Sequence, residues 1–185
     1  MKKIFVVIVF CCFLFSNSIA SFASEETAVF AGGCFWCLEH DLESLTGVIN
    51  ADSGYSGGDL KEPTYRRHEG HQEVVKVEFD PESISYEKLL RVFFRNIDPL
   101  DNEGQFCDRG DSYRPVIFTI GELQPSVANE GIKAVAKELQ IPSDDIKVDI
   151  KPLKKFWIAE DYHQNYAEIN SLRYQFYRYS CGRDK

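Results

Sequence analysis

The chain has 185 residues, and 21 lysine and arginine residues against 29 aspartate and glutamate residues give it a formal net charge of −8 at pH 7. A chain of this length is expected to form one domain with a self-sufficient core, so its six cysteines are not required as staples. The acidic balance argues against nucleic acid and anionic membranes as partners, because both bind basic patches.

The first 23 residues have the pattern of a secretory signal peptide. A basic start at residues 1–3 precedes an apolar run over residues 4–15 and a segment rich in small residues, SNSIASFAS. The apolar run is short for a membrane-spanning helix, which needs roughly 20 residues; a retained N-terminal anchor is the alternative. Cleavage is expected after Ala20 or Ala23, which leaves residues 24–185 as a single domain in the periplasm or outside the cell.

Cleavage changes the charge and the cysteine content of the mature protein. Loss of Lys2 and Lys3 shifts the formal net charge from −8 to −10, and no membrane contact is expected once the signal peptide is gone. The cysteines that remain are Cys34, Cys37, Cys107 and Cys181. Cysteines in an exported chain usually form disulfides, so a disulfide-stabilised domain is the first hypothesis.

Strands and helices are expected to alternate along the first half of the domain. TAVFAGG, residues 27–33, is typical of a short buried strand that ends in glycines, and residues 34–45 repeat apolar side chains at helical spacing. GVINADSGYSGG, residues 47–58, predicts a strand and then a glycine-rich loop. EVVKVEFDP, residues 73–81, alternates apolar and charged side chains, which predicts a half-buried strand. Ser85 is expected to cap the helix that follows.

The second half of the domain begins with a long polar loop over residues 96–113, a type of segment that often carries function. A strand is expected over residues 113–121, and Pro115 places it at an edge of the sheet or limits it to starting there. A helix over residues 125–139 and a strand over residues 147–153 follow.

Residues 159–178 predict a last helix, followed by an irregular tail. The order of elements is strand, helix, strand, strand, helix, strand, helix, strand. This order predicts an α+β fold, a two-layer sandwich with a ferredoxin-like core, in which helices pack on a mixed, mainly antiparallel sheet.

AGGCFWCLEH, residues 31–40, places Cys34 and Cys37 three positions apart. Haem attachment needs a histidine directly after the second cysteine, where this chain has Leu38. A zinc site needs four ligands, typically from two such pairs, and the chain has one pair. We therefore expect no metal and no organic cofactor.

A strand, two glycines and a helix place Cys34 at or near a helix N-terminus. Free N–H groups and the helix dipole stabilise a thiolate there, which lowers the pKa of the thiol and produces its reactive form. Gly32 and Gly33 permit a sharp turn and leave the sulfur open to a substrate. Cys34 is therefore a candidate nucleophile, and Phe35 and Trp36 are a candidate pocket wall for a small apolar group.

GCFWC, residues 33–37, resembles the Gly-Cys-Phe-Trp signature of the A-type peptide methionine sulfoxide reductases. Further blocks resemble that family in the same order: GVINADSGYSGG, PTY at residues 63–65, GHQEVVKVEFDP at residues 70–81, NIDPLDNEGQFCDRGDSYRPVIF at residues 96–118 and FWIAEDYHQNY at residues 156–166. The resemblance covers about residues 28–182. It implies an enzyme that reduces the S epimer of methionine sulfoxide, free or in proteins, to methionine.

The resemblance implies a nucleophile, an acid and an apolar cage. Cys34 attacks the sulfoxide sulfur and is left as a sulfenic acid. Glu73 protonates the sulfoxide oxygen, which requires that burial raise the pKa of this carboxyl. Phe35 and Trp36 enclose the methyl group of the substrate.

The resemblance also implies groups that hold the sulfoxide oxygen. Tyr65 and Tyr113 match the two pocket tyrosines of the family, which donate hydrogen bonds to that oxygen. Asp108 matches an acid that holds a water molecule or the pocket geometry. The segment of seven residues after Tyr65 is about four residues shorter than in many members. His71 and His163 match family blocks and are assigned to structural support.

A second cysteine is expected to condense with the sulfenic acid on Cys34 to form a disulfide, which an external dithiol reduces. Cys181 ranks first, because many members carry this resolving cysteine in a mobile C-terminal tail. Cys107 abuts Asp108, and Cys37 is nearest in sequence. The expected partners are oxidised proteins and free methionine sulfoxide as substrates and a thioredoxin-like protein as reductant, and a monomer is expected.

Two other function classes fit parts of the sequence. A non-catalytic exported domain predicts four cysteines locked in two disulfides and no reactive thiol. A thioredoxin-like oxidoreductase would use Cys34 and Cys37 on other disulfides. That hypothesis gives no role to Glu73, Tyr113 or Asp108.

Overall fold

The computed structural model describes residues 25–183, so the predicted signal peptide lies outside the described residues. The strands are β1 Glu26–Ala31, β2 Val48–Ser56, β3 Gln72–Phe79, β4 Gly104–Gln105, β5 Asp108–Arg109, β6 Val116–Thr119, β7 Asp149–Pro152 and β8 Trp157–Ile158. The helices are α1 Phe35–Glu43, α2 Tyr86–Arg95, α3 Gln124–Leu139, α4 Tyr166–Ile169 and α5 Ser171–Cys181. Within the described range, no helix is both long enough and apolar enough to cross a membrane.

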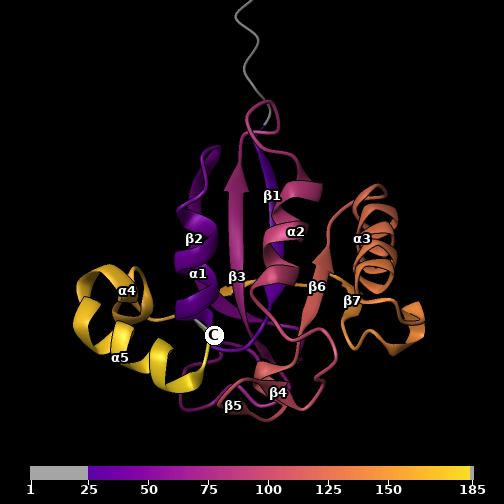
Figure 1. The fold of residues 1–185 in the computed structure, drawn as a ribbon. Coiled ribbons are helices and arrows are strands. Elements are labelled where there is room, and N and C mark those ends of the chain that lie inside the picture. The colour runs from indigo at the N-terminus through magenta and orange to yellow at the C-terminus, as the bar shows by residue number, and fades with distance from the viewer. Residues whose placement is uncertain (1–24, 184–185) are drawn as a thin grey trace, which may run out of the picture.

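One sheet forms the centre of the molecule, with its strands in the order β7-β6-β1-β3-β2-β8 (Figure 1). Helices α1 and α2 lie on one face of this sheet, α3 lies beside β6 and β7, and α4 and α5 lie beyond α1 and β2. Strands β4 and β5 form a separate hairpin at one end of the sheet. The chain therefore brings its C-terminal helices and this hairpin to the end of the sheet where α1 begins.

Six elements in chain order, β1, α1, β2, β3, α2 and β6, form the ferredoxin-like core that the sequence predicts. Strand β3 lies between β1 and β2 and is antiparallel to both, and β6 is antiparallel to β1. Strand β7 adds parallel to β6, and β8 adds antiparallel to β2. The predicted α+β fold with a mixed, mainly antiparallel sheet is confirmed. Pro115 directly precedes β6, so this strand takes an interior position without losing a ladder hydrogen bond.

The larger hydrophobic core lies between the sheet and helices α1 and α2. Phe30 of β1 stacks on Phe93 of α2 with ring centroids 5.1 Å apart. Leu38 and Leu42 of α1 are fully buried against the same layer. Full burial of a side chain of this size contributes about 1.5–3 kcal/mol. This layer therefore fixes the position of α1 on the sheet.

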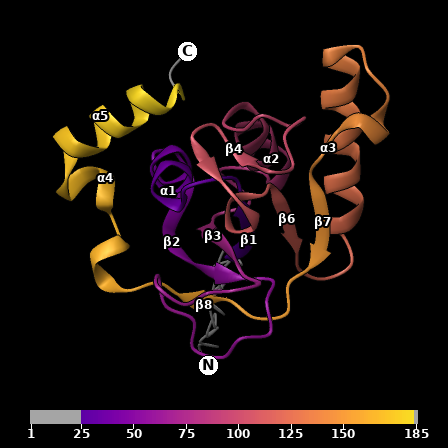
Figure 2. The ribbon, with the colours of Figure 1, turned by 90° about the horizontal axis from the view of Figure 1, so that it is seen from below.

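The opposite face of the sheet is covered by the segment that links β7 to β8 (Figure 2). Leu153 and Phe156 of this segment pack on a second core. The sequence predicts a half-buried strand over residues 73–81, and this is wrong for the first part of β3, where Glu73, Val74 and Val75 are all buried. The covering segment is the cause, because it removes solvent from the second face of that part of β3.

The C-terminal region departs from the predicted single helix over residues 159–178. It contains a 3₁₀ turn at Asp161–His163 and then the two separate helices α4 and α5. Asn165 has a left-handed backbone (φ 52°), and Asn170 between the helices has a φ of −119°, so neither residue continues a helix. The predicted irregular tail is also wrong: α5 continues to Cys181 and ends at Gly182, whose left-handed backbone caps it.

Glu39 of α1 joins the helix to β2 and to the C-terminal region. Its carboxyl accepts hydrogen bonds from the Ser53 hydroxyl at 2.6 Å and from the Asn165 N–H at 2.7 Å. The side chain is buried, and this burial raises the pKa of Glu39 to about 7 against the opposing effect of both hydrogen bonds. Glu39 therefore exchanges its proton near neutral pH.

Replacement Glu39→Gln is expected to remove part of the pH dependence of stability. Between about pH 4.5 and 7 the folded chain keeps a proton on Glu39 that the unfolded chain has released, so the free energy of unfolding falls as pH rises. Glutamine mimics the protonated form. The variant should match the wild type at pH 5 and exceed it at pH 8 by up to about 3 kcal/mol in urea unfolding. The exposed control Glu122→Gln should behave as the wild type. If the free energy of unfolding falls equally between pH 5 and 8 in the wild type, in Glu39→Gln and in this control, the raised pKa of Glu39 is contradicted.

Candidate active site

Cys34 lies at the junction of β1 and α1, where it is the N-cap residue of the helix. Gly33 before it has a positive φ of 80° and donates its N–H to the Tyr113 carbonyl at 3.2 Å. A Cβ at position 33 would lie 2.7 Å from the Cβ of Gln105, so the turn requires glycine. The sequence predicts a sulfur open to substrate at this turn. Cys34 is instead only 6% exposed, because other segments close over it.

Glu73 meets the start of α1 from the beginning of β3. The Phe35 N–H donates to the Glu73 carboxyl at 3.1 Å, and Glu73 is only 2% exposed. Burial raises the pKa of this carboxyl to about 8, while the hydrogen bond from Phe35 opposes the shift. Glu73 is therefore protonated at neutral pH, which is the condition that an acid in this position must meet.

The prediction that the helix N-terminus lowers the pKa of Cys34 is wrong for this structure. Burial raises the pKa of the thiol well above its usual value, and the neighbouring Cys37 and Glu73 add to the effect. The physical reason is that burial outweighs the effect of the helix N-terminus. The Phe35 N–H is bonded to Glu73, and the Cys34 side chain makes no capping hydrogen bond to the helix. The N-terminal charge of α1 thus acts on the acid instead of the thiol.

The four cysteines of the described chain fall into two pairs with different chemistry. Cys107 and Cys181 form a disulfide, with their Cα atoms 5.0 Å apart. Cys34 and Cys37 are free and buried, and the two thiols are hydrogen bonded to each other. This hydrogen bond lowers the pKa of Cys37 in spite of burial. The hypothesis of a domain with all four cysteines in disulfides is therefore wrong.

Asp108 and Tyr177 come from distant segments and form a hydrogen-bonded pair beside Cys34. The Tyr177 hydroxyl donates to the Asp108 carboxylate at 2.5 Å and lies within hydrogen-bonding range of the Cys34 sulfur. Burial raises the pKa of Tyr177 far above its usual value, so it remains a donor. The sequence assigns Asp108 to the pocket and misses Tyr177. Tyr177 lies one helical turn before Cys181, and this spacing is the sequence signal that places Tyr177 and Cys181 on the same side of α5.

Tyr65 and Tyr113 face the same space as Cys34. Burial raises the pKa of both tyrosines, and Glu73, Asp108 and Cys34 act in the same direction, so the two tyrosines lie within electrostatic range of these three predicted residues. The short segment after Tyr65 does not remove this tyrosine from the site. A tight turn pairs Thr64 with Arg67, and the Tyr65 N–H donates to Glu160 at 3.0 Å, which holds Tyr65 at the rim.

Phe35 and Trp36 form an aromatic wall together with His163. The Phe35 ring is buried, and its centroid lies 4.9 Å from that of His163. Trp36 donates its indole N–H to Nδ1 of His163 at 3.0 Å and stacks on Tyr166 with centroids 3.7 Å apart. Burial lowers the pKa of His163, so the ring stays neutral and can accept this hydrogen bond. His163 thus has the supporting role that the sequence predicts.

His71 is also a structural residue, as predicted. It is buried at the start of β3, accepts the Gly58 N–H at 3.2 Å and contacts the Leu60 carbonyl at 2.9 Å. These two contacts anchor the glycine-rich loop after β2.

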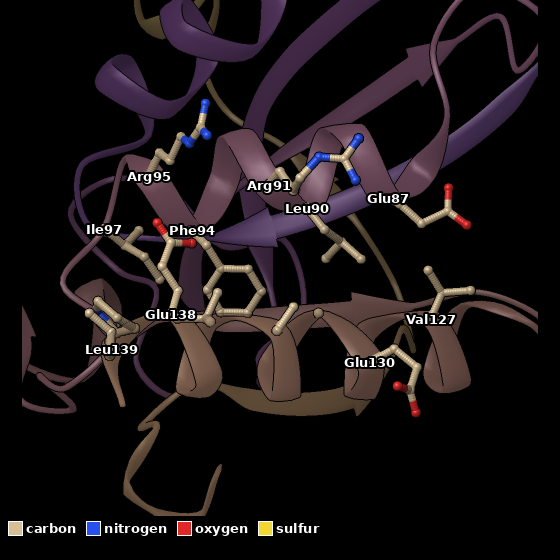
Figure 3. A pocket seen from close by; sticks show the side chains of 14 residues that line it. Glu87, Leu90, Arg91, Phe94, Arg95, Ile97, Val127, Glu130, Glu138 and Leu139 are labelled. Carbon is tan, nitrogen blue, oxygen red and sulfur yellow. The ribbon is translucent and has the colours of Figure 1, made fainter. Parts of the chain in front are cut away.

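An apolar groove lies elsewhere, between α2 and α3 (Figure 3). Leu90, Phe94 and Ile97 line a space of about 450 Å³ there, with Arg91 and Glu138 at its rim. None of the predicted site residues lines this groove. The candidate active site is therefore identified by its reactive groups and not by the size of a cavity.

Comparison with known proteins agrees with this chemistry. The peptide methionine sulfoxide reductase family model matches residues 26–185. The chain is 48% identical over 163 residues to peptide methionine sulfoxide reductase MsrA 2 of Caulobacter vibrioides, which covers 86% of this chain and 82% of that protein. It is 47% identical over 167 residues to peptide methionine sulfoxide reductase MsrA/MsrB of Vibrio cholerae, covering 88% of this chain but only 44% of that longer protein.

The fold gives the same result. The structure of methionine sulfoxide reductase A of Corynebacterium diphtheriae matches with a TM-score of 0.73 at 31% sequence identity, over 80% of this chain and 76% of that one. Because the family model spans the whole described domain and both sequence and fold agree with its members, the chain belongs to the peptide methionine sulfoxide reductase family of oxidoreductases.

Proposed function

We propose that this chain reduces the S epimer of methionine sulfoxide, free or in proteins, to methionine. The observation that carries this proposal is the meeting of a thiol and a protonated carboxyl at the start of α1. Cys34 supplies the soft nucleophile, and Glu73, with a pKa of about 8, supplies the proton at neutral pH. Tyr65 and Tyr113 add hydrogen-bond donors at the same point.

In the first half of the reaction, the Cys34 sulfur attacks the sulfoxide sulfur while Glu73 gives its proton to the sulfoxide oxygen. The thiol proton of Cys34 passes to the Cys37 thiolate along the hydrogen bond that joins them. The sulfur–oxygen bond of the substrate breaks and methionine leaves. The oxygen remains on Cys34 as a sulfenic acid, so the substrate sulfur gains two electrons and the Cys34 sulfur loses two.

In the second half, we propose Cys37 as the resolving cysteine. The sequence ranks Cys181 first, but Cys181 is bonded to Cys107, whereas Cys37 is the free thiol beside Cys34. Cys37 returns its proton to Glu73, and its thiolate attacks the sulfenic sulfur. A sulfur–sulfur bond forms, and hydroxide leaves as water with the proton of Glu73.

An external dithiol then reduces the new disulfide by exchange, and we propose a thioredoxin-like protein as its source. Mxr1 of Saccharomyces cerevisiae has been solved in complex with Trx2. In the proposed cycle the Cys107–Cys181 disulfide takes no part in electron transfer. It holds α5, and with it Tyr177, against the site.

Export to the periplasm or the cell exterior is proposed from residues 1–23. The enzyme would repair oxidised methionines of envelope or secreted proteins there and would need a reductant in the same compartment. The N-terminus of protein purified from an envelope fraction is expected at Ser21 or Ser24. Recovery of the uncleaved chain from the cytosol alone would contradict export.

Turnover of the separated S and R epimers of a blocked methionine sulfoxide, with dithiothreitol as reductant, tests the activity. The wild type is expected to reduce the S epimer alone, and Cys34→Ser should lose this activity because it removes the nucleophile. Cys107→Ser should keep part of it, since that cysteine lies outside the cycle and only helps to hold α5 in place. Activity on neither epimer, together with reduction of insulin disulfides, would favour the thioredoxin-like alternative.

The resolving cysteine is tested in the same preparation without reductant. After one turnover, peptide mass spectrometry should find a bridge between Cys34 and Cys37, with Cys107 and Cys181 still joined. A bridge from Cys34 to Cys107 or Cys181 would overturn the assignment of Cys37.

The role of Glu73 predicts a bell-shaped pH profile of kcat/KM. One limb rises as Cys37, whose pKa is lowered, loses its proton and becomes able to accept that of Cys34, and the other falls as Glu73, with its pKa of about 8, loses the proton that the sulfoxide needs. Glu73→Gln should lower the rate by about 10²–10⁴-fold and remove the falling limb. Glu78→Gln, on the same strand but only half-buried, is the matched control and should keep the wild-type profile. A falling limb that persists in Glu73→Gln would assign the proton to another group.

A further inference from the structure

Arg183 lies behind the active site, although it comes from the last described turn of the chain. Gly182 ends α5 in a left-handed conformation (φ 79°) and turns the chain toward the start of α1. The Arg183 guanidinium then donates from Nη2 to the Gly32 carbonyl at 2.9 Å and from Nη1 to the Asn96 carbonyl at 3.3 Å. It also covers the Phe106 ring at 4.6 Å from the centroid. Arg183 therefore ties the C-terminus to the turn that carries Cys34.

The Cys107–Cys181 disulfide determines where this arginine begins. Cys181 lies two residues before Arg183, and its bond to Cys107 fixes the end of α5 beside the β4–β5 hairpin. Phe106, on which the guanidinium stacks, belongs to the same hairpin. The disulfide and the stacking contact thus hold the guanidinium at one place, which a flexible tail would not do.

Arg183 also supplies positive charge that acts on Cys37 from its place on the Gly32 carbonyl. Within residues 25–183 its hydrogen-bond acceptors are carbonyl oxygens, and it forms no ion pair with a carboxylate. Arg178, the other cation near Cys37, is paired with Asp41 at 2.8 Å, so part of its charge is balanced. The titratable and charged groups that act on or respond to Cys37 are Cys34, Asp41, Glu73, Tyr174, Arg178 and Arg183.

The pKa of Cys37 is consistent with this arrangement. The hydrogen bond with Cys34 lowers it most, Arg183 lowers it next, and burial acts in the opposite direction. Once Cys34 is a sulfenic acid, its S–H group is gone and can no longer donate this hydrogen bond. The arginine charge remains through that step.

We propose that Arg183 is a positioning residue for the second half of the reaction, in which it holds the Gly32–Gly33 turn and stabilises the Cys37 thiolate that attacks the Cys34 sulfenic acid. In that attack the sulfur–oxygen bond breaks and the sulfur–sulfur bond forms. The sulfenic sulfur is reduced, the Cys37 sulfur is oxidised, and the oxygen leaves as water. The inference rests on the proposed reductase function and on Cys37 as the resolving cysteine.

The test separates charge from structure with three variants of the full domain. Arg183→Gln removes the charge, Arg183→Lys keeps it, and Arg173→Gln removes a charge from the exposed face of α5 as the matched control. Enzyme is mixed with the S epimer without reductant and quenched in acid at intervals, from pH 6 to 9. Methionine release reports the first half, and mass spectrometry of the Cys34–Cys37 bridge reports the second.

Arg183→Gln is expected to slow formation of the Cys34–Cys37 bridge by roughly tenfold at pH 7 and to shift the midpoint of its pH profile upward by about one unit, as expected for loss of one nearby charge. Arg183→Lys should restore the midpoint even if its rate stays low. Arg173→Gln should match the wild type. A sulfenic acid trapped by dimedone should accumulate in Arg183→Gln.

Three outcomes overturn the inference. An unchanged pH midpoint in Arg183→Gln would leave Arg183 with a structural role only. If Arg183→Lys does not restore the midpoint of the pH profile, the positive charge of Arg183 is not what stabilises the Cys37 thiolate. Normal methionine release without a Cys34–Cys37 bridge in the wild type would remove Cys37 as the target. If the wild type releases no methionine from the S epimer, the proposed function itself fails, and this result is distinct from the other three.

Discussion

The hydrogen bond from the Phe35 N–H to the Glu73 carboxyl is the contact on which the active site depends. It joins the first residue of α1 to the second residue of β3, and so fixes the reacting sulfur and the acid relative to each other. The Glu73 carboxyl accepts one hydrogen bond and is shielded from solvent. It remains protonated at neutral pH, because the effect of burial on its pKa outweighs that of the single hydrogen bond. The hydrophobic cores on the two faces of the sheet hold this arrangement in place. Helix α1 packs in the larger core, and β3 contributes side chains to both cores.

The C-terminal region completes the site from outside the ferredoxin-like core. Its α4–α5 segment supplies Tyr177, which bridges Asp108 and Cys34, and the preceding loop supplies His163, which orients Trp36. Glu39 and the Cys107–Cys181 disulfide attach this region at its two ends. Glu39 accepts a hydrogen bond from the Asn165 N–H, and the disulfide is a covalent bond. A region joined at both ends can contribute side chains to a site without being part of the central sheet.

Sequence patterns predict those features that local periodicity and motif spacing control. The strand–glycine–cysteine–helix arrangement, the cap at Ser85 and the order of the core elements all follow from residues close together in the chain. The pKa of Cys34 could not be predicted in this way, because it depends on burial and on the nearby Glu73, and local spacing reports neither. Tyr177 and Arg183 were missed for the same reason: their partners come from the far end of the chain. The break between α4 and α5 depends on two asparagines whose backbone conformation no hydrophobic pattern reports.

The buried, un-ionised Cys34 favours a particular account of reactivity. A thiolate exposed at a helix N-terminus would react with any oxidant that reaches it, because oxidation follows thiolate character and exposure. Here burial keeps the proton on Cys34, and the neighbouring Cys37 provides a place for that proton only a hydrogen bond away. In the proposed cycle, ionisation of the nucleophile accompanies the arrival of a substrate that accepts a proton from Glu73. Burial raises the pKa of the Cys34 thiol and also that of the Glu73 carboxyl. The same physical cause therefore protects the nucleophile from oxidation and keeps the proton on the acid.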